Sequence, residues 1–384
     1  MNLTTIKKYL LFAFLIENIM TQTSLLGAYT EYFFYPFLLI GLLFMFGPTV
    51  WQRSSIKKFG WMYALMVVYV VYEFAVGPEY ISSKTLLYLL AKIVTFGIII
   101  ESIAVNEEFY REKAIYWMIL AMAFVLAYGV LSGTGLGDGT RMRAGFTNEN
   151  TTGSMGATIV GMLLFYMRDK RWSIWTILLL LIGFFGVLAG GSRAGFLMIF
   201  LLIFLRYGIN VKTVGLIALL WITGLYLLPA LDIHTIGIQR LIDTYNGIEG
   251  TNRDAERGAA EWMIAQKPWI GWGFYSQNQG YAATLTELGS HNGYLETFKA
   301  MGIPMGVIFF FSIAIAIFKY LRAAKRYKEK MTLFFAIVLV LIVKANYEGL
   351  FVGVHEFMTN LFFFALAMVS SRTYALKQSY LSKS

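Results

Sequence analysis

Apolar runs recur along the whole chain and are separated by short polar segments. Most approach the roughly 20 residues that cross a bilayer as an α-helix, and none alternates with the two-residue period of barrel strands. Several are short, which indicates tilted or partial spans. We expect an all-α polytopic membrane protein of about twelve transmembrane helices, in which residues 1–384 form a single integral membrane domain. The predicted spans lie near residues 6–22, 32–47, 61–77, 84–104, 114–132, 154–167, 173–189, 194–207, 212–230, 293–318, 331–352 and 358–376.

The composition supports this class. Of 384 residues, 58% are hydrophobic and 14% are charged, which excludes an ordinary soluble domain. The chain has no cysteine, so disulfides and thiolate metal sites are excluded. The long polar loop at about residues 231–292, between predicted spans 9 and 10, must therefore be held by packing and hydrogen bonds.

Lysine and arginine are concentrated in alternate loops, on one of the two predicted faces. Short cytoplasmic loops collect these residues, so we expect both termini to be cytoplasmic and the long loop to be extracytoplasmic. The net charge of +10 then reflects topology and contact with anionic lipid, and nucleic acid is not an expected partner. The inner segments hold Lys7, Lys8, Arg53, Lys57, Lys58, Arg111, Lys113, Arg168, Lys170, Arg171, Arg206, Lys212, the basic cluster at 319–330, Arg372, Lys377 and Lys383.

A few arginines remain on the predicted outer face, where this tendency does not explain them. Arg141 and Arg143 lie in GTRMRAGFTNEN, Arg193 lies in the small-residue turn GGSRAG, and Arg253 and Arg257 lie in TNRDAER of the long loop. Guanidinium groups keep their charge and bind phosphate oxygens through paired hydrogen bonds. Together they favour a site for a lipid-linked pyrophosphate.

Each arginine also has a simpler interpretation. The pair in GTRMRAGFTNEN suits a solvated loop, and the four-residue spacing of Arg253 and Arg257 suits one helix face with salt bridges to Asp254 or Glu261. Arg193 is different, because a turn of a few residues holds it near the membrane plane, where an unpaired charge is costly.

His291, in Ser-His-Asn-Gly-Tyr, lies where the polar loop gives way to an apolar helix. An imidazole there would titrate at the water boundary, although a structural role is equally compatible with the sequence. His234 and His355 are expected to be structural. Lys92 and Lys344, inside predicted spans, are either snorkelling residues or part of a transport pathway.

The sequence lacks the common motifs for a metal site or for phosphate binding by a P-loop. The predicted outer side holds no Asp-x-Asp pair or His-Glu-x-x-His motif, and the chain has no phosphate-binding P-loop. We therefore predict neither a metal nor another cofactor. Arginines would then neutralise the charge of a departing pyrophosphate.

Taken together, these segments resemble the O-antigen ligase and polysaccharide polymerase superfamily of bacterial envelopes, over roughly residues 130–310. The family's tryptophan four residues after the loop arginine is replaced here by Arg257, so either this residue or Arg253 takes the family role. The shared features, in the family's order, are the span count, Gly145-Phe146-x-Asn148-x-Asn150, the Gly-Ser-Arg-x-Gly turn at 191–195, the large loop after the ninth span, Arg253 ahead of Pro268, Gly271 and Gly273, and Ser290-His291-Asn292.

The resemblance implies a metal-independent glycosyltransferase with a GT-C-like fold, acting on undecaprenyl-diphosphate-linked oligosaccharide at the outer face of the bacterial cytoplasmic (inner) membrane. Arg193 and Arg253 would stabilise the pyrophosphate as leaving group, and His291 would deprotonate or position the attacking hydroxyl. The lipid bilayer and other polysaccharide assembly proteins are the further partners expected. The implied substrate-binding residues are Arg257, Arg141, Arg143, Asn148, Asn150, Ser192 and Asn292.

Polymerase and ligase share these motifs and differ in acceptor. We favour a polymerase for a capsule, exopolysaccharide or O-antigen, because nothing indicates a lipid A core acceptor. A ligase for such an acceptor is the alternative. A flippase or exporter without chemistry, and a scaffold, are weaker alternatives.

Overall fold

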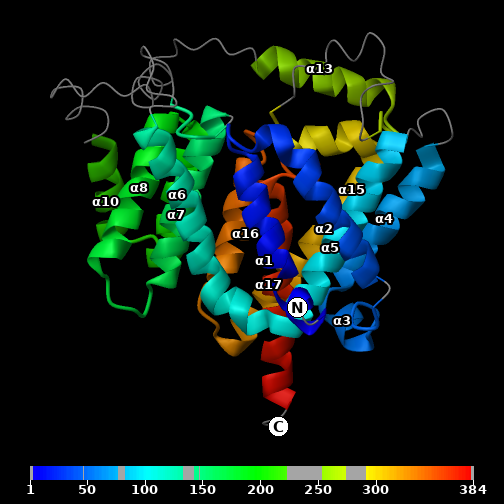
Figure 1. Ribbon diagram of the computed structural model, residues 1–384, viewed down its shortest axis with the longest axis horizontal. Coiled ribbons are helices and arrows are strands. Elements are labelled where there is room, and N and C mark those ends of the chain that lie inside the picture. Colours follow the sequence, from blue (N-terminus) through cyan, green and yellow to red (C-terminus); the bar gives the residue numbers. More distant parts are fainter. Residues whose placement is uncertain are drawn as a thin grey trace.

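The computed structural model describes residues 3–45, 47–76, 83–132, 142–146, 148–222, 253–273 and 291–381 (Figure 1). Regular structure in these ranges is helical, and one isolated bridge joins Thr23 to Phe146. The prediction of an all-α protein is therefore confirmed. Arg141, His234 and Ser290 lie outside the described residues.

The helices follow the predicted apolar runs. They are α1 (Leu3–Thr21), η1 (Gly27–Tyr29), α2 (Thr30–Met45), α3 (Arg53–Lys58), α4 (Gly60–Val76), α5 (Ser83–Phe109), η3 (Tyr110–Ala114), α6 (Ile115–Leu131), α7 (Glu149–Tyr166), α8 (Ile174–Gly190), α9 (Arg193–Tyr207), α10 (Val211–Ile222), α13 (Arg253–Gln266), α15 (Gly293–Tyr327), α16 (Leu333–Lys344) and α17 (Phe357–Leu381).

Each of the twelve predicted runs overlaps one of these helices, but the lengths differ, and residues 223–230 of the ninth run lie outside the described residues. Within the described ranges, the helical stretches Leu86–Leu131 and Gly293–Tyr327 are long and apolar enough to cross a membrane, and several other apolar helices are shorter. The number of twelve spans therefore stays a prediction. The run at 331–352 was predicted too long, because α16 ends at Lys344 and residues 345–356 form turns.

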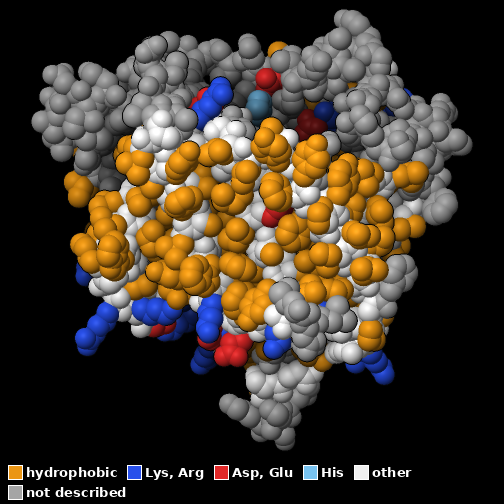
Figure 2. Space-filling view, in the orientation of Figure 1, with side chains coloured by type: hydrophobic (Ala, Val, Ile, Leu, Met, Phe, Trp, Pro, Cys, Tyr) orange, Lys and Arg blue, Asp and Glu red, His pale blue; other side chains and the backbone are white. Residues whose placement is uncertain are grey.

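The visible surface carries a broad hydrophobic band. Figure 2 shows this band, with lysine and arginine side chains gathered along the edge nearer the two termini. Large apolar side chains such as Trp175, Phe124 and Phe311 are more than half exposed, which suits contact with lipid rather than water. We call the opposite end of the bundle, where α13 lies, the site end (Figure 1).

Helix α17 forms the centre of the bundle. Every side chain from Leu361 to Val369 is buried, so this part of the helix is covered on all sides. It packs against α15, α16, α5 and α1. Packing against α17 sets the relative positions of these four helices, and segments described below begin or end on them.

Small residues let α7 approach α8 and α9 closely. A Cβ atom on Gly156 would lie 2.5 Å from the carbonyl oxygen of Gly183, and one on Gly153 would lie 2.3 Å from Cβ of Ser192. Close backbone approach of this kind is typical of helix packing in membranes. It holds the turn that contains Arg193 against the first turns of α7.

We expect Gly156→Ala to destabilise the protein by about 1–3 kcal/mol, because the added methyl group meets the α8 backbone. Thermal unfolding in detergent measures the effect. Gly215→Ala in α10 is the matched control, since its Cβ would meet no atom within 4 Å. There the substitution should be neutral or stabilising by up to about 1 kcal/mol. Equal melting temperatures for the two variants would contradict the close packing.

Candidate active site

Helix α15 is kinked at Gly302, whose φ of +74° is not helical, and Pro304 follows two residues later. Proline cannot donate the backbone hydrogen bond that would continue the helix. The part before the kink therefore runs across the site end, while the rest descends through the bundle (Figure 1). His291 and Asn292 precede the crossing part.

The Pro-x-x-Gly-x-Gly segment binds the backbone opened by this kink. Trp272 N donates to Lys299 O at 2.9 Å, Gly273 N donates to Ala300 O at 3.0 Å, and Ile303 N donates to Pro268 O at 2.7 Å. A Cβ on Gly271 would lie 2.4 Å from Ala300 O, so only glycine allows this approach. The segment thus docks the end of α13 onto α15.

Docked in this way, α13 turns an acidic residue toward the predicted histidine. Glu256 lies on the same helix face as the buried Ala260 and Met263. Its Oε2 is 3.8 Å from Nε2 of His291, and its side chain is 9% exposed. This distance is within ion-pair range but too long for a hydrogen bond. The structure therefore adds Glu256 to the residues predicted from the sequence.

The two loop arginines, Arg253 and Arg257, lie on the same helix as Glu256. Arg257 is exposed, and its Nε donates to Glu261 Oε1 at 2.8 Å, as the salt-bridge interpretation of the sequence predicted. Arg253 is the first residue of α13, and its side chain lies outside the described part. The backbone places it at the start of the helix that carries Glu256.

His291 has a left-handed backbone conformation with φ of +45°, which is uncommon outside glycine. Asn292 then caps α15, because its Oδ1 accepts hydrogen bonds from the backbone N–H groups of Tyr294 and Leu295. Asn292 was predicted to bind substrate. The structure gives it a capping role that fixes the backbone directly after the histidine.

The turn that contains Arg193 has a similar construction. Gly191 ends α8 in a left-handed conformation, and Ser192 Oγ caps α9 by accepting from Gly195 N at 3.2 Å. Asn148 caps the adjacent α7 by accepting from Asn150 N at 2.7 Å. Arg193, which is partly buried, thus lies where two helix N-termini meet. Positive helix-dipole ends and a guanidinium make this a favourable place for an anion.

Arg143 lies on the segment that precedes α7. Its Nε donates to Glu149 Oε1 at 2.9 Å, and its side chain is 62% exposed. Asn150 is partly buried in the first turn of α7. The simpler interpretation of Arg143, as a residue of a solvated loop, matches this exposure.

Helix α16 connects the arginine turn with the histidine. It packs against α9 and α7, and the carbonyl of Ala345, the residue after its end, accepts from Gly293 N at 2.7 Å. The helix that begins at Arg193 and the start of α15 are thus both contacted by α16 or by the residue that follows it. Among the described residues, no group of three or more His, Asp or Glu side chains is arranged to hold a metal ion.

The helical bundle, its exposed apolar band and the polar residues at one end define an α-helical membrane protein with a candidate site for an anionic substrate. Residues 178–311 match the family model described as O-Antigen ligase, which confirms the resemblance over this part of the chain. Members of this family are membrane proteins that ligate or polymerise lipid-linked glycans. None of the curated proteins matches the chain at a significant level.

We expect Gly271→Ala to detach α13 from α15, because the methyl group would meet Ala300 O. Chymotrypsin cleavage after Trp272, whose N–H binds Lys299 O, should become about tenfold faster, since the docked segment opens locally more often. Gly258→Ala, whose Cβ would meet no atom within 4 Å, should leave cleavage unchanged. Identical cleavage rates in the two variants would show that the docking of α13 does not depend on this contact.

Proposed function

We propose that the protein is a membrane glycosyltransferase that polymerises undecaprenyl-diphosphate-linked oligosaccharide repeats. The observation that supports this most is the extent of the family match. Residues 178–311 include the Arg193 turn, Glu256 and His291, which the fold brings to one end of the bundle. Ligation or polymerisation of lipid-linked glycans is the activity common to this family.

In the proposed reaction, an acceptor hydroxyl attacks the anomeric carbon of the lipid-linked sugar. The bond between this carbon and the pyrophosphate oxygen breaks, and undecaprenyl diphosphate leaves. His291 takes the hydroxyl proton, and Glu256 stabilises the imidazolium that forms, since opposite charges 3.8 Å apart attract. Attack from the face opposite the leaving group inverts the anomeric centre.

The leaving group acquires negative charge as its bond breaks. Arg193, at the joined N-termini of α7 and α9, is positioned to neutralise this charge, and Arg253 begins the helix that carries Glu256. Ser192, Asn148 and Asn292 contribute by capping the helices at the site. Arg141, Arg143, Arg257 and Asn150 remain proposed contacts to the glycan or to phosphate.

The orientation follows from the charge distribution. Lysine and arginine gather at the edge of the band nearer both termini, which supports a cytoplasmic location for the termini (Figure 2). The site end would then face outward from the bacterial cytoplasmic membrane. Lipid-linked repeats and other assembly proteins for a capsule, exopolysaccharide or O-antigen would meet the enzyme there.

Ligation to another envelope acceptor, such as a lipid A core, is the alternative that the family match equally allows. The flippase alternative depended on Lys92 and Lys344 as path-lining cations. Lys92 Nζ donates to the carbonyl of Phe351 at 3.0 Å, and Lys344 Nζ is 2.5 Å from Glu348 Oε2. Both lysines are thus engaged by protein groups, which weakens the carrier alternative.

We expect purified enzyme in liposomes to extend a synthetic undecaprenyl-diphosphate oligosaccharide into a ladder in the presence of excess chelator. Arg193→Lys and His291→Ala should lower the initial rate by about 10²-fold or more, because a lysine cannot form paired hydrogen bonds with phosphate and alanine cannot accept a proton. Gel analysis of product size measures the result.

The matched control is Arg206→Lys, at the opposite end of α9, where Nε donates to Leu164 O at 3.1 Å. Its rate should stay near that of the wild type. Transfer of a single glycan only when another acceptor is supplied would identify a ligase. Full activity in both site variants would refute the proposed site.

A further inference from the structure

Residues 345–356 join α16 to α17 across the site end, and we call them the strap. The strap contacts the start of α15 directly. Gly293 N donates to Ala345 O at 2.7 Å and to Glu348 O at 3.1 Å, and a Cβ on Gly293 would lie 2.6 Å from Leu350 O. The residue two positions after His291 is therefore seated against the strap without room for a side chain.

Lys92 binds the middle of the strap. It lies within the apolar helix α5 and is almost completely buried. Its Nζ donates to the backbone carbonyls of Phe351, at 3.0 Å, and Gly353. Burial of an ammonium group is costly unless hydrogen bonds compensate it, so these two contacts are strong constraints on the strap.

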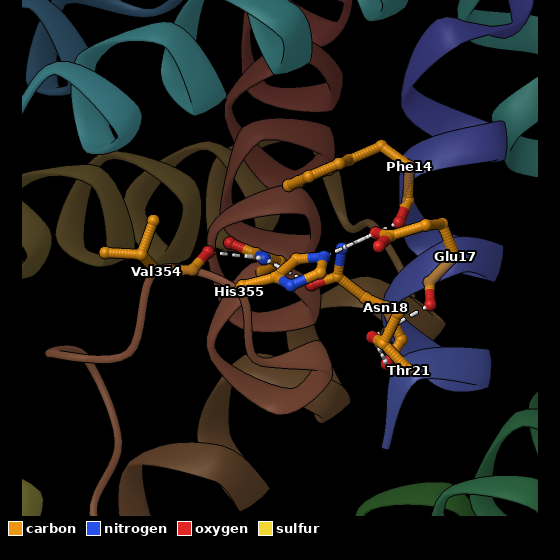
Figure 3. Close-up of polar contacts among 7 residues, drawn as sticks. Phe14, Glu17, Asn18, Thr21, Val354 and His355 are labelled. Atoms are coloured by element: carbon orange, nitrogen blue, oxygen red, sulfur yellow. Dashed lines mark hydrogen bonds and ion pairs between the residues drawn. The ribbon is translucent and has the colours of Figure 1, made fainter. Parts of the chain in front are cut away.

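Other polar contacts hold the two ends of the strap. At its beginning, Lys344 pairs with Glu348 at 2.5 Å. At its end, Nε2 of His355 lies 2.5 Å from Oε2 of Glu17 in α1, as Figure 3 shows. Asn360 Nδ2 donates to Val354 O at 3.0 Å. Between these two ends, Lys92 supplies the polar contacts to the central residues of the strap.

Strained backbone conformations occur on both sides of the contact between the strap and α15. Phe351 has φ of +80° and His291 has φ of +45°, backbone values that residues other than glycine rarely adopt. Such conformations persist only when the surrounding structure fixes them. Lys92 binds the carbonyl of Phe351, Leu350 precedes it and meets Gly293, and Gly293 lies two residues after His291.

We propose that Lys92 is a positioning residue for His291: by binding the strap at Phe351 and Gly353, it keeps the start of α15 in place and the imidazole beside Glu256. The catalytic consequence rests on the proposed function of His291. The positional consequence does not, because it concerns the histidine's surroundings alone. This role is a third interpretation of Lys92, beside snorkelling and transport.

The test is Lys92→Met, which keeps the length of the side chain and removes its hydrogen-bond donors. We expect kcat to fall about tenfold or more while KM for the lipid-linked donor changes little, since the base is misplaced and the donor site is intact. Acylation of His291 by diethyl pyrocarbonate, followed by mass spectrometry, should become several-fold faster.

Gly293→Ala is a second variant, which separates strap and helix while Lys92 is intact. We expect the same two changes, because the new Cβ would meet Leu350 O and N. Lys58→Met is the matched control, because Lys58 pairs with Glu107 at the other end of α5 and does not contact the strap. It should match the wild type in both measurements.

A wild-type acylation rate at His291 in folded Lys92→Met and Gly293→Ala proteins would overturn the inference, whatever their activity. Loss of activity without any change in acylation would likewise assign Lys92 a role other than positioning. If His291→Ala retained polymer synthesis, the proposed function would fail. The acylation rates would still decide whether Lys92 positions the histidine.

Discussion

The arrangement of the site depends on the hydrogen-bond partners of the peptide groups that the kink at Gly302 leaves unpaired within the helix. Breaking a helix in an apolar environment leaves peptide groups that must find other partners, because water is not available to them. Here the Pro268–Gly273 segment supplies these partners through three backbone hydrogen bonds. The kink therefore turns the start of α15 across the bundle and, by the same contacts, holds α13 above it. The pairing of Glu256 with His291 follows from this arrangement.

Helix capping is the second organising feature of the site end. Asn292, Ser192 and Asn148 each accept backbone N–H groups at the start of a helix, and each was expected from the sequence to contact substrate. Their amide or hydroxyl oxygens fix the three N-termini around which the arginine turn and the histidine lie, while their contact with substrate stays a prediction. A cap of this kind still serves an anionic substrate, because it orients the positive end of the helix.

Much of the fold was predictable from the sequence, because apolar runs in a membrane must form helices to satisfy their backbone. The positions of His291 at a helix start and of Arg193 in a tight turn were predictable because both residues lie next to the ends of apolar runs. Glu256 was missed, although its spacing from Ala260 and Met263 is that of one buried helix face. The strap was also missed, because the run at 331–352 reads as continuous until Gly349 and Gly353 are recognised as turn signals. Contacts between distant segments, such as that of Lys92 with the strap, have no local sequence signal.

The most direct measurement is an experimental structure of the protein bound to undecaprenyl diphosphate in the presence of a chelator, determined by electron cryomicroscopy. We expect the pyrophosphate at the site end, with its oxygens within hydrogen-bonding distance of the Arg193 guanidinium and its lipid-distal side facing His291. A pyrophosphate bound near the termini, or at the site end in contact with neither residue, would contradict a single reaction centre formed by the arginine turn and the histidine.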